Sequence, residues 1–296
     1  MRRSLLTGLM MGLALSAAPL AAAAKASGHP AIPSAIFTDP PADPAHPPRM
    51  EVLHIPSGGL EINGVAYLAG GAGLHPTVVL LHGLPGNEKN LDLAQAIRRA
   101  GWNVVTFNYR GSWGSPGTYN FRGNLADTKA VLAYVRAPTN ATKLGIDTAK
   151  LVLMGHSMGG GITAVTAGSD PALAGAVMIS AADLGVLARA PQAVRLQTAR
   201  ENMESLAGVT PESMAQELGA LTDASFAAAA PGLAKMPLLV LTSDDGLAPM
   251  SDALVSNLRN LGDTRVSSVH EATDHGWSGK RIALETLVIN WLLALK

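Results

Sequence analysis

The sequence GHSMG, at residues 155–159, sets Ser157 between two glycines directly after the apolar run 151–154. A helical pattern follows, so the serine falls at a turn between a strand and a helix. A Cβ two residues before or after the serine would collide with neighbouring backbone in such a sharp turn. We therefore predict that Ser157 presents its hydroxyl as a nucleophile, with the Met158 amide at the positive end of the helix as an oxyanion donor.

A serine nucleophile needs a general base, and the base needs a carboxylate to orient it. Six of the eight histidines lie in the proline-rich segment, the early strands or the two glycine-rich loops, which leaves His270 and His275. Asp244 and Asp245 end the apolar run "PLLVLTS", and Asp183 follows the earlier run "VMIS". Each of these three aspartates satisfies the chain order serine, aspartate, histidine.

The sequence HGLPG, at residues 82–86, is a second loop that leaves an apolar run. A chain that turns here can aim a backbone amide at the strand ends, although a plain turn with a structural His82 is the simpler alternative. The sequence HEATDH, at residues 270–275, has one residue too many for the zinc motif H-E-x-x-H, so we expect no metal site there.

Short apolar runs rich in valine and leucine alternate with segments of helical period. The runs are typical of parallel strands covered on both faces, and residues 50–68 indicate two antiparallel strands at a sheet edge. Strand alternating with helix predicts an α/β fold with a doubly wound, mostly parallel sheet. In such sheets a ligand site gathers at the carboxyl ends of the strands, where Ser157 falls.

From about Met50 to its end the chain resembles the α/β-hydrolase superfamily, in particular bacterial serine hydrolases with HGxPG after the third strand and GHSMGG at the nucleophile turn. The resemblance implies that His275, in the loop before the last helix, is the base. It also implies that Asp245, four residues before Pro249, is the acid, with Asp183 and Asp244 as alternatives. The Leu84 amide is then the second oxyanion donor beside Met158.

Substrate choice is expected to depend on what covers this site. The resemblance places a small helical cap insertion at about residues 181–235, in which Phe226 and other apolar side chains line an acyl pocket or only pack the cap onto the main domain. Further substrate-lining candidates are Trp113 and Tyr119 in the glycine-rich loop after a strand, and Trp277 beside the expected base.

Residues 1–26 carry two arginines, an apolar segment and then small residues that suit an A-x-A cleavage site. We predict a cleavable signal peptide, with a retained membrane anchor as the alternative, and hence a periplasmic or secreted protein without stable membrane insertion. Residues 27–48 are crowded with proline and are expected to form a linker or strap, and residues 49–296 the α/β-hydrolase domain.

Composition limits the remaining classes of function. The 22 basic and 22 acidic residues cancel, and aromatic residues make up 4% of the chain, so no nucleic-acid partner is expected. The chain has no cysteine, which excludes disulfides and thiol chemistry.

The sequence thus predicts a serine hydrolase that acts on a small-molecule ester or related acyl substrate and needs no cofactor. The alternatives are a serine peptidase, an amidase or an acyltransferase with the same residues. A non-catalytic binding protein of the same fold is an alternative of a different class.

Overall fold

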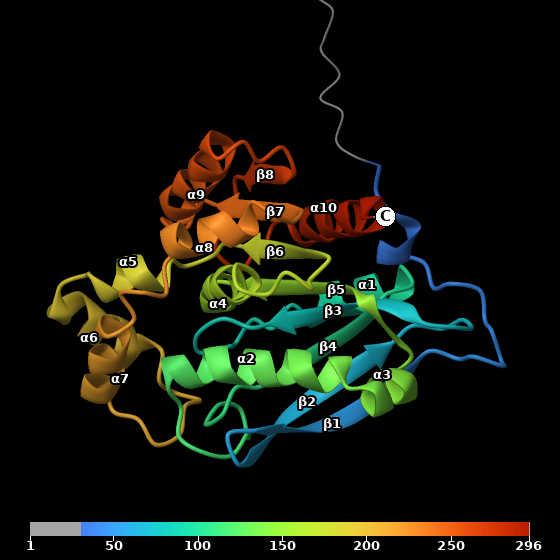
Figure 1. The fold of residues 1–296 in the computed structure, drawn as a ribbon, viewed down its shortest axis with the longest axis horizontal. Helices are drawn as coiled ribbons and strands as arrows, with labels where there is room; N and C mark the ends of the chain where they lie inside the picture. Colours follow the sequence, from blue (N-terminus) through green and yellow to red (C-terminus); the bar gives the residue numbers. More distant parts are fainter. Residues whose placement is uncertain (1–30, 296) are drawn as a thin grey trace, which may run out of the picture. The chain divides into compact units, whose positions relative to one another are not determined.

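The computed structural model describes residues 31–295, and the predicted signal peptide, residues 1–26, lies outside this range. The centre of the fold is an eight-stranded sheet in the order β1-β2-β4-β3-β5-β6-β7-β8 (Figure 1). The strands from β3 to β8 pair in parallel, whereas β1 and β2 are antiparallel to their neighbours. The predicted α/β fold class is confirmed. The strands are Arg49–Ser57 (β1), Leu60–Leu68 (β2), His75–Leu81 (β3), Asn103–Phe107 (β4), Ile146–His156 (β5), Gly175–Ile179 (β6), Leu238–Ser243 (β7) and Val266–Glu271 (β8).

The central strands consist of apolar runs because helices cover both faces of the sheet. Every residue of β6 and β7 is buried, as is the second half of β5. Strand β1 instead alternates between buried and exposed positions, as expected at an edge with one face in solvent. Burial of the central strands on both faces fixes which strand ends meet, and therefore which loops surround Ser157.

Two helices, α1 and α10, pack on one face of the sheet, and α2, α4, α8 and α9 pack on the other (Figure 1). Each face has its own apolar core, and each core includes alternate side chains of the same strands. None of the helices described between residues 31 and 295 is long and apolar enough to cross a membrane. The helices of this layer structure, with the short α3, are Leu91–Arg99 (α1), Phe121–Arg136 (α2), Pro138–Leu144 (α3), Met158–Ala167 (α4), Phe226–Leu233 (α8), Ala248–Asn260 (α9) and Arg281–Ala294 (α10).

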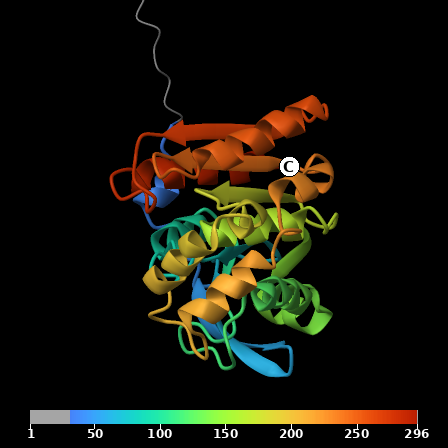
Figure 2. The ribbon, with the colours of Figure 1, turned by 90° about the vertical axis from the view of Figure 1, so that its left-hand side faces the viewer.

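Between β6 and β7 the chain forms three further short helices before α8. They are Leu184–Ala188 (α5), Gln192–Glu201 (α6) and Pro211–Gly219 (α7). Helices α6 and α7 pack against each other, and the two ribbon views show them beyond the carboxyl ends of the parallel strands (Figures 1 and 2). This segment therefore lies on the side of the sheet where the predicted site residues gather.

Residues 31–48 form a short 3-10 helix, Ser34–Ile36, within otherwise irregular chain. Arg99 of α1 donates a hydrogen bond to the Ile36 carbonyl over 2.9 Å, and Asn290 of α10 donates to the Ala31 carbonyl over 3.0 Å. This segment is thus tied to the two helices of one sheet face.

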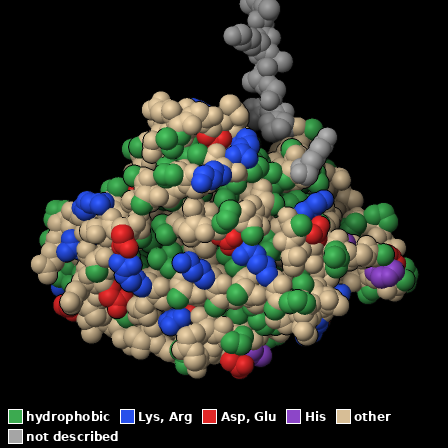
Figure 3. Space-filling model, viewed as in Figure 1, with side chains coloured by type: hydrophobic (Ala, Val, Ile, Leu, Met, Phe, Trp, Pro, Cys, Tyr) green, Lys and Arg blue, Asp and Glu red, His purple; other side chains and the backbone are tan. Residues whose placement is uncertain are grey.

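Basic and acidic side chains are scattered over the face of the molecule seen in Figure 3.

The turn after β5 packs so closely on its surroundings that it has no space for side chains at its glycines. A Cβ on Gly155 would overlap the Gly159 carbonyl, and a Cβ on Gly159 would lie 2.6 Å from the carbonyl oxygens of Leu81 and His82. Both contacts are with backbone, which cannot move without displacing a central strand. Gly159 therefore allows the turn to touch the end of β3, and Gly155 allows β5 to lie against the first turn of α4.

Replacing Gly155 tests this packing. We expect Gly155→Ala to lower the free energy of unfolding by about 1–3 kcal/mol, because the added methyl group must displace backbone. Gly279→Ala is the matched control, since no atom lies within 4 Å of a Cβ built there. Urea unfolding of both variants measures the difference, and equal midpoints for Gly155→Ala and the wild type would contradict it.

Candidate active site

Ser157 occupies the sharp turn between β5 and α4 with φ 58° and ψ −123°. Few residues other than glycine adopt a positive φ, and such strain persists only where the surrounding structure enforces it. The Ser157 amide donates to the Ile179 carbonyl over 2.9 Å, and the Ser157 carbonyl accepts from the Ala182 amide over 3.0 Å. Both bonds join the turn to the end of β6 and hold the serine in this conformation. Met158 is the first residue of α4, so its amide lies at the helix N-terminus beside the serine.

The loop of residues 82–90, between β3 and α1, passes directly beside Ser157. A Cβ on Gly83 would lie 2.8 Å from the Ser157 Cβ and 3.3 Å from its Oγ. Leu84, the predicted oxyanion donor, is the next residue. His82 is buried at the start of this loop, and its Nδ1 lies 2.7 Å from the Gly83 carbonyl oxygen. Burial lowers the pKa of His82 to about 4, so this imidazole is neutral near pH 7 and serves the loop structurally.

The structure joins His275 to Asp245 through a hydrogen bond of 2.7 Å from Nδ1 to Oδ2. The Asp245 side chain is only 3% exposed, and its other oxygen accepts the Leu247 amide over 2.9 Å. Burial raises the pKa of this carboxyl, but the hydrogen bonds from His275, Leu247 and Ser243 outweigh burial and hold the pKa at about 2. Asp245 is therefore ionised near neutral pH and can orient the imidazole, whose Nε2 stays free of this contact.

His156, the residue before Ser157, connects His275 to the serine turn. Its Nε2 donates to the His275 carbonyl over 2.8 Å, and the two imidazole rings are 4.6 Å apart between centroids. Burial, followed by the nearby His275, lowers the pKa of His156 to about 4. Because the His156 imidazole is neutral, it holds the loop of His275 without placing a positive charge beside His275. The sequence analysis did not assign this role to His156.

The alternative base and the alternative acid form a second pair of their own. His270 Nε2 lies 3.0 Å from Asp244 Oδ1, and the Thr242 hydroxyl lies 3.0 Å from His270 Nδ1. The Asp244 side chain is 62% exposed, in contrast to that of Asp245. This second pair therefore lies in solvent, where an ion pair contributes little.

Asp183, the third candidate acid, caps two helices. Its Oδ1 accepts the Val186 amide at the start of α5, and its Oδ2 accepts the Phe226 amide at the start of α8, each over 3.0 Å. Both oxygens of this buried carboxylate thus bind backbone donors. The geometry gives Asp183 a structural role in the 181–235 segment.

Three of the four expected substrate-lining side chains are buried in the structure. Tyr119 and Phe226 are buried in the core on the α4 face of the sheet, and Trp277 is fully buried in the core on the opposite face. The Trp277 Nε1 donates to Ser180 Oγ over 3.0 Å, and the Tyr119 hydroxyl donates to the Met158 sulfur over 3.2 Å. Tyr119 therefore contacts the residue after Ser157, and Trp277 contacts the end of β6 next to the serine turn. Trp113 alone of the four remains substantially exposed, at 39%.

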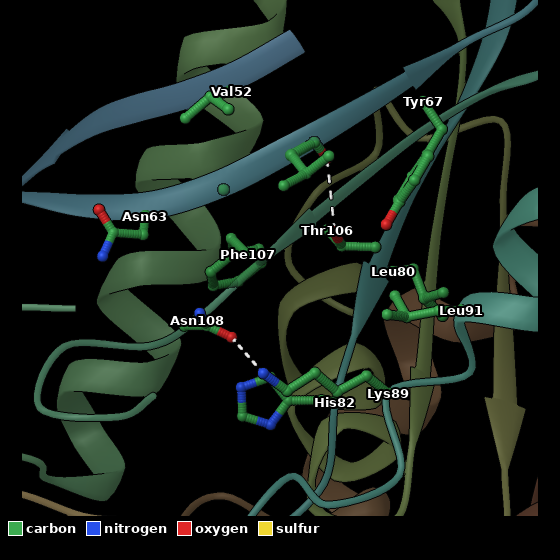
Figure 4. Close-up of a pocket in the computed structure, with 12 residues that line it drawn as sticks. Val52, Asn63, Tyr67, Leu80, His82, Lys89, Leu91, Thr106, Phe107 and Asn108 are labelled. Carbon is green, nitrogen blue, oxygen red and sulfur yellow. Dashed lines mark hydrogen bonds between the residues drawn. The ribbon is translucent and has the colours of Figure 1, made fainter. Parts of the chain in front are cut away.

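A cavity of about 250 Å³ lies beside the 82–90 loop and is drawn in Figure 4. At one end the Lys89 ammonium donates to Asn108 Oδ1 over 2.9 Å, close to the His82 ring (Figure 4). Its lining comes from β1, β2, β3, β4, the start of α1 and the loops of residues 82–90 and 108–120: Val52, Asn63, Gly64, Val65, Tyr67, Leu80, His82, Lys89, Leu91, Thr106, Phe107 and Asn108. Ser157, Asp245 and His275 are absent from this lining. Among residues 31–295, no group of three or more histidine or acidic side chains could hold a metal ion.

The strand order, the serine turn after β5 and the histidine and aspartate at neighbouring strand ends together define a hydrolase-type α/β architecture. The family described as "alpha/beta hydrolase fold" matches residues 76–266, and the chain belongs to this family. The predicted superfamily is thereby confirmed.

Individual relatives match more weakly. Lysophosphatidylserine lipase ABHD12 of Rattus norvegicus is 32% identical over 91 residues, which are 30% of this chain and 21% of that protein. The matched region thus spans only about a fifth of that relative. The esterase of Pyrobaculum calidifontis superposes with a TM-score of 0.62 and 22% identity over 85% of this chain and 88% of the esterase. Pyrococcus horikoshii acylaminoacyl peptidase has a TM-score of 0.61 and 18% identity over 83% of this chain and 41% of the peptidase. These two likenesses concern the fold.

The low pKa of Asp245 predicts how its contribution to stability changes with pH. Because the pKa of this carboxyl falls from 3.8 to about 2 on folding, its ionised form stabilises the folded state above about pH 4. That contribution is lost as the pH falls through 2. We expect Asp245→Asn to be less stable than the wild type at pH 6, with the gap narrowing between pH 4 and pH 2. Urea unfolding at each pH measures the gap, and the exposed Asp244→Asn is the control. A gap that widens as the pH falls would contradict this assignment.

Proposed function

We propose that the protein is a serine hydrolase that cleaves carboxylic esters or related acyl bonds through an acyl-enzyme on Ser157. The observation that carries this proposal is the arrangement at the end of β5. A strained serine lies beside the 82–90 loop, and His275, bound to a buried and ionised Asp245, is held against the same turn by His156.

In the proposed mechanism the Ser157 hydroxyl attacks the substrate carbonyl while His275 Nε2 takes the serine proton. The Leu84 and Met158 amides donate hydrogen bonds to the oxyanion of the tetrahedral intermediate, which collapses as His275 protonates the leaving group. A water molecule, deprotonated by His275, then attacks the acyl-enzyme. Collapse of the second intermediate releases the acid and regenerates the Ser157 hydroxyl.

An ester is the preferred substrate class, and an amide or peptide is the second candidate. No acidic pair in an obvious pocket for a substrate amine can be read from the sequence of the 181–235 segment, which favours esters. The fold likeness to an acylaminoacyl peptidase is the reason for retaining an amide or peptide as the second candidate substrate. An acyltransferase would use the same residues with an acceptor other than water.

The proposed mechanism is tested with a fluorophosphonate probe and p-nitrophenyl esters of increasing chain length, alongside matched anilides. We expect the probe to label the wild type but neither Ser157→Ala nor His275→Ala, because an unactivated serine reacts slowly. Ester turnover should fall by at least about 10³-fold in both variants. Faster cleavage of the anilides than of the esters would favour an amide over an ester as the substrate class.

The second histidine–aspartate pair provides matched controls. His270→Ala removes a histidine from the end of β8, and Asp244→Asn removes the carboxylate next to Asp245. Both variants should keep labelling and turnover near the wild-type values. Asp183→Ala removes the helix caps but should still be labelled when folded. A folded wild type that neither reacts with the probe nor turns over any ester would overturn the hydrolase proposal in favour of a non-catalytic binding protein.

We also propose that the protein is exported to the periplasm or secreted, because residues 1–26 have the pattern of a cleavable signal peptide. N-terminal sequencing of the protein from cell fractions measures this directly. We expect a mature chain that starts near residue 25 or 27 outside the cytoplasm. An intact N-terminus in the cytoplasmic fraction would contradict export.

A further inference from the structure

We propose that Trp113 is a positioning residue that holds the 82–90 loop, and with it the Leu84 amide, in place beside Ser157. Trp113 lies in the loop of residues 108–120 between β4 and α2. The role of the Leu84 amide in this inference rests on the proposed function. The hold of Trp113 on the loop is a separate structural statement and can be tested separately.

The Pro85 carbonyl accepts hydrogen bonds from two side chains outside its own loop. Trp113 Nε1 donates to it over 2.7 Å, and the Ser205 hydroxyl donates over 3.3 Å. Ser205 belongs to the connection between α6 and α7. The shorter bond comes from the indole, so Trp113 supplies the firmer of the two restraints.

Trp113 also holds the far end of the same loop. The Lys89 ammonium lies 4.4 Å from the centroid of the indole ring, within the range of a cation–π contact. Lys89 in turn donates to Asn108 Oδ1, and Asn108 Nδ2 donates to the Trp113 carbonyl over 3.1 Å. Pro85 and Lys89 flank the exposed turn of the loop, so a single side chain restrains the loop on both sides.

The backbone of Trp113 is strained, which indicates that its side chain is needed at this position. Its φ is +49°, a conformation that a bulky aromatic residue rarely adopts and that a glycine would adopt without cost. Strain of this kind persists only where other contacts compensate for it. The bonds of Trp113 to Pro85 and Asn108, with the Lys89 contact, are those compensating contacts.

The same loop joins the site to the 181–235 segment. The Ala207 amide donates to the Gly111 carbonyl over 2.7 Å, and the Tyr119 amide donates to the Ala207 carbonyl over 3.0 Å. The Trp113 amide donates to the Ser205 carbonyl over 3.3 Å. The α6–α7 connection is therefore bonded to the Trp113 loop by backbone and to Pro85 by Ser205. A displacement of the α6–α7 connection would therefore shift Pro85, and with it the neighbouring Leu84 amide.

Loss of the indole donor should act on the transition state more than on substrate binding. An oxyanion donor works only if it is already in position, and a displacement of a fraction of an ångström weakens it. Trp113→Phe keeps an aromatic ring for the Lys89 contact and removes the indole N–H together with the five-membered ring that carries it. We expect kcat for a p-nitrophenyl ester to fall about tenfold or more, with KM within about twofold of the wild type. Ser205→Ala should show the same split with a smaller fall.

Hydrogen–deuterium exchange of residues 82–90 measures the hold on the loop without reference to activity. We expect faster exchange there in Trp113→Phe and a smaller increase in Ser205→Ala. Trp291→Phe, on α10, is the matched control and should change neither exchange nor kcat.

Unchanged exchange and unchanged kcat in a folded Trp113→Phe would overturn the inference, as would a change in KM alone. If Trp113→Phe does not fold, Ser205→Ala decides by the same two measurements. A wild type without serine reactivity would refute the proposed function, and the exchange experiment would then decide the loop restraint by itself.

Discussion

The contact between the serine turn and the end of β3 is the constraint on which the rest of the site depends. Gly159 has no side chain, so the turn lies against the carbonyls of Leu81 and His82, and Gly83 lies against Ser157 itself. This contact joins the end of β5 to the loop that contains Leu84. The absence of a side chain at Gly155 lets β5 lie directly against the first turn of α4. The strained φ of Ser157 is maintained by hydrogen bonds to the end of β6. The proposed nucleophile, Ser157, and the proposed oxyanion donors, the Leu84 and Met158 amides, are thereby held next to one another.

Burial distinguishes the proposed acid and base from their neighbours. Two histidine–aspartate pairs form at the ends of β7 and β8, and their hydrogen bonds are of similar length. Only Asp245 is almost fully buried, and only His275 is in contact with the serine turn through His156. A buried carboxylate with a low pKa can hold an imidazole in one orientation, whereas an exposed pair exchanges its partners for water. Because of this difference in burial, we propose Asp245 as the acid and His275 as the base.

The sequence predicted the fold and the main candidates because those features are local. The GHSMG turn and each apolar run can be recognised within a few residues, and the order of serine, aspartate and histidine is read directly along the chain. The burial of Tyr119, Phe226 and Trp277 could not be read from the sequence, since burial depends on which distant segments pack against a residue. Roles for His156 and Ser205 were missed for the same reason. Their partners, His275 and Pro85, are more than 100 residues away in the chain.

The most direct test of the central claim is a crystal structure of the protein soaked with an arylboronic acid, which mimics the tetrahedral intermediate. We expect a covalent bond from boron to Ser157 Oγ. We also expect one boronate oxygen within hydrogen-bond distance of the Leu84 and Met158 amides, and His275 Nε2 near another. A boronate bound elsewhere, or an unmodified Ser157 at saturating inhibitor, would contradict the claim that this turn presents an activated nucleophile.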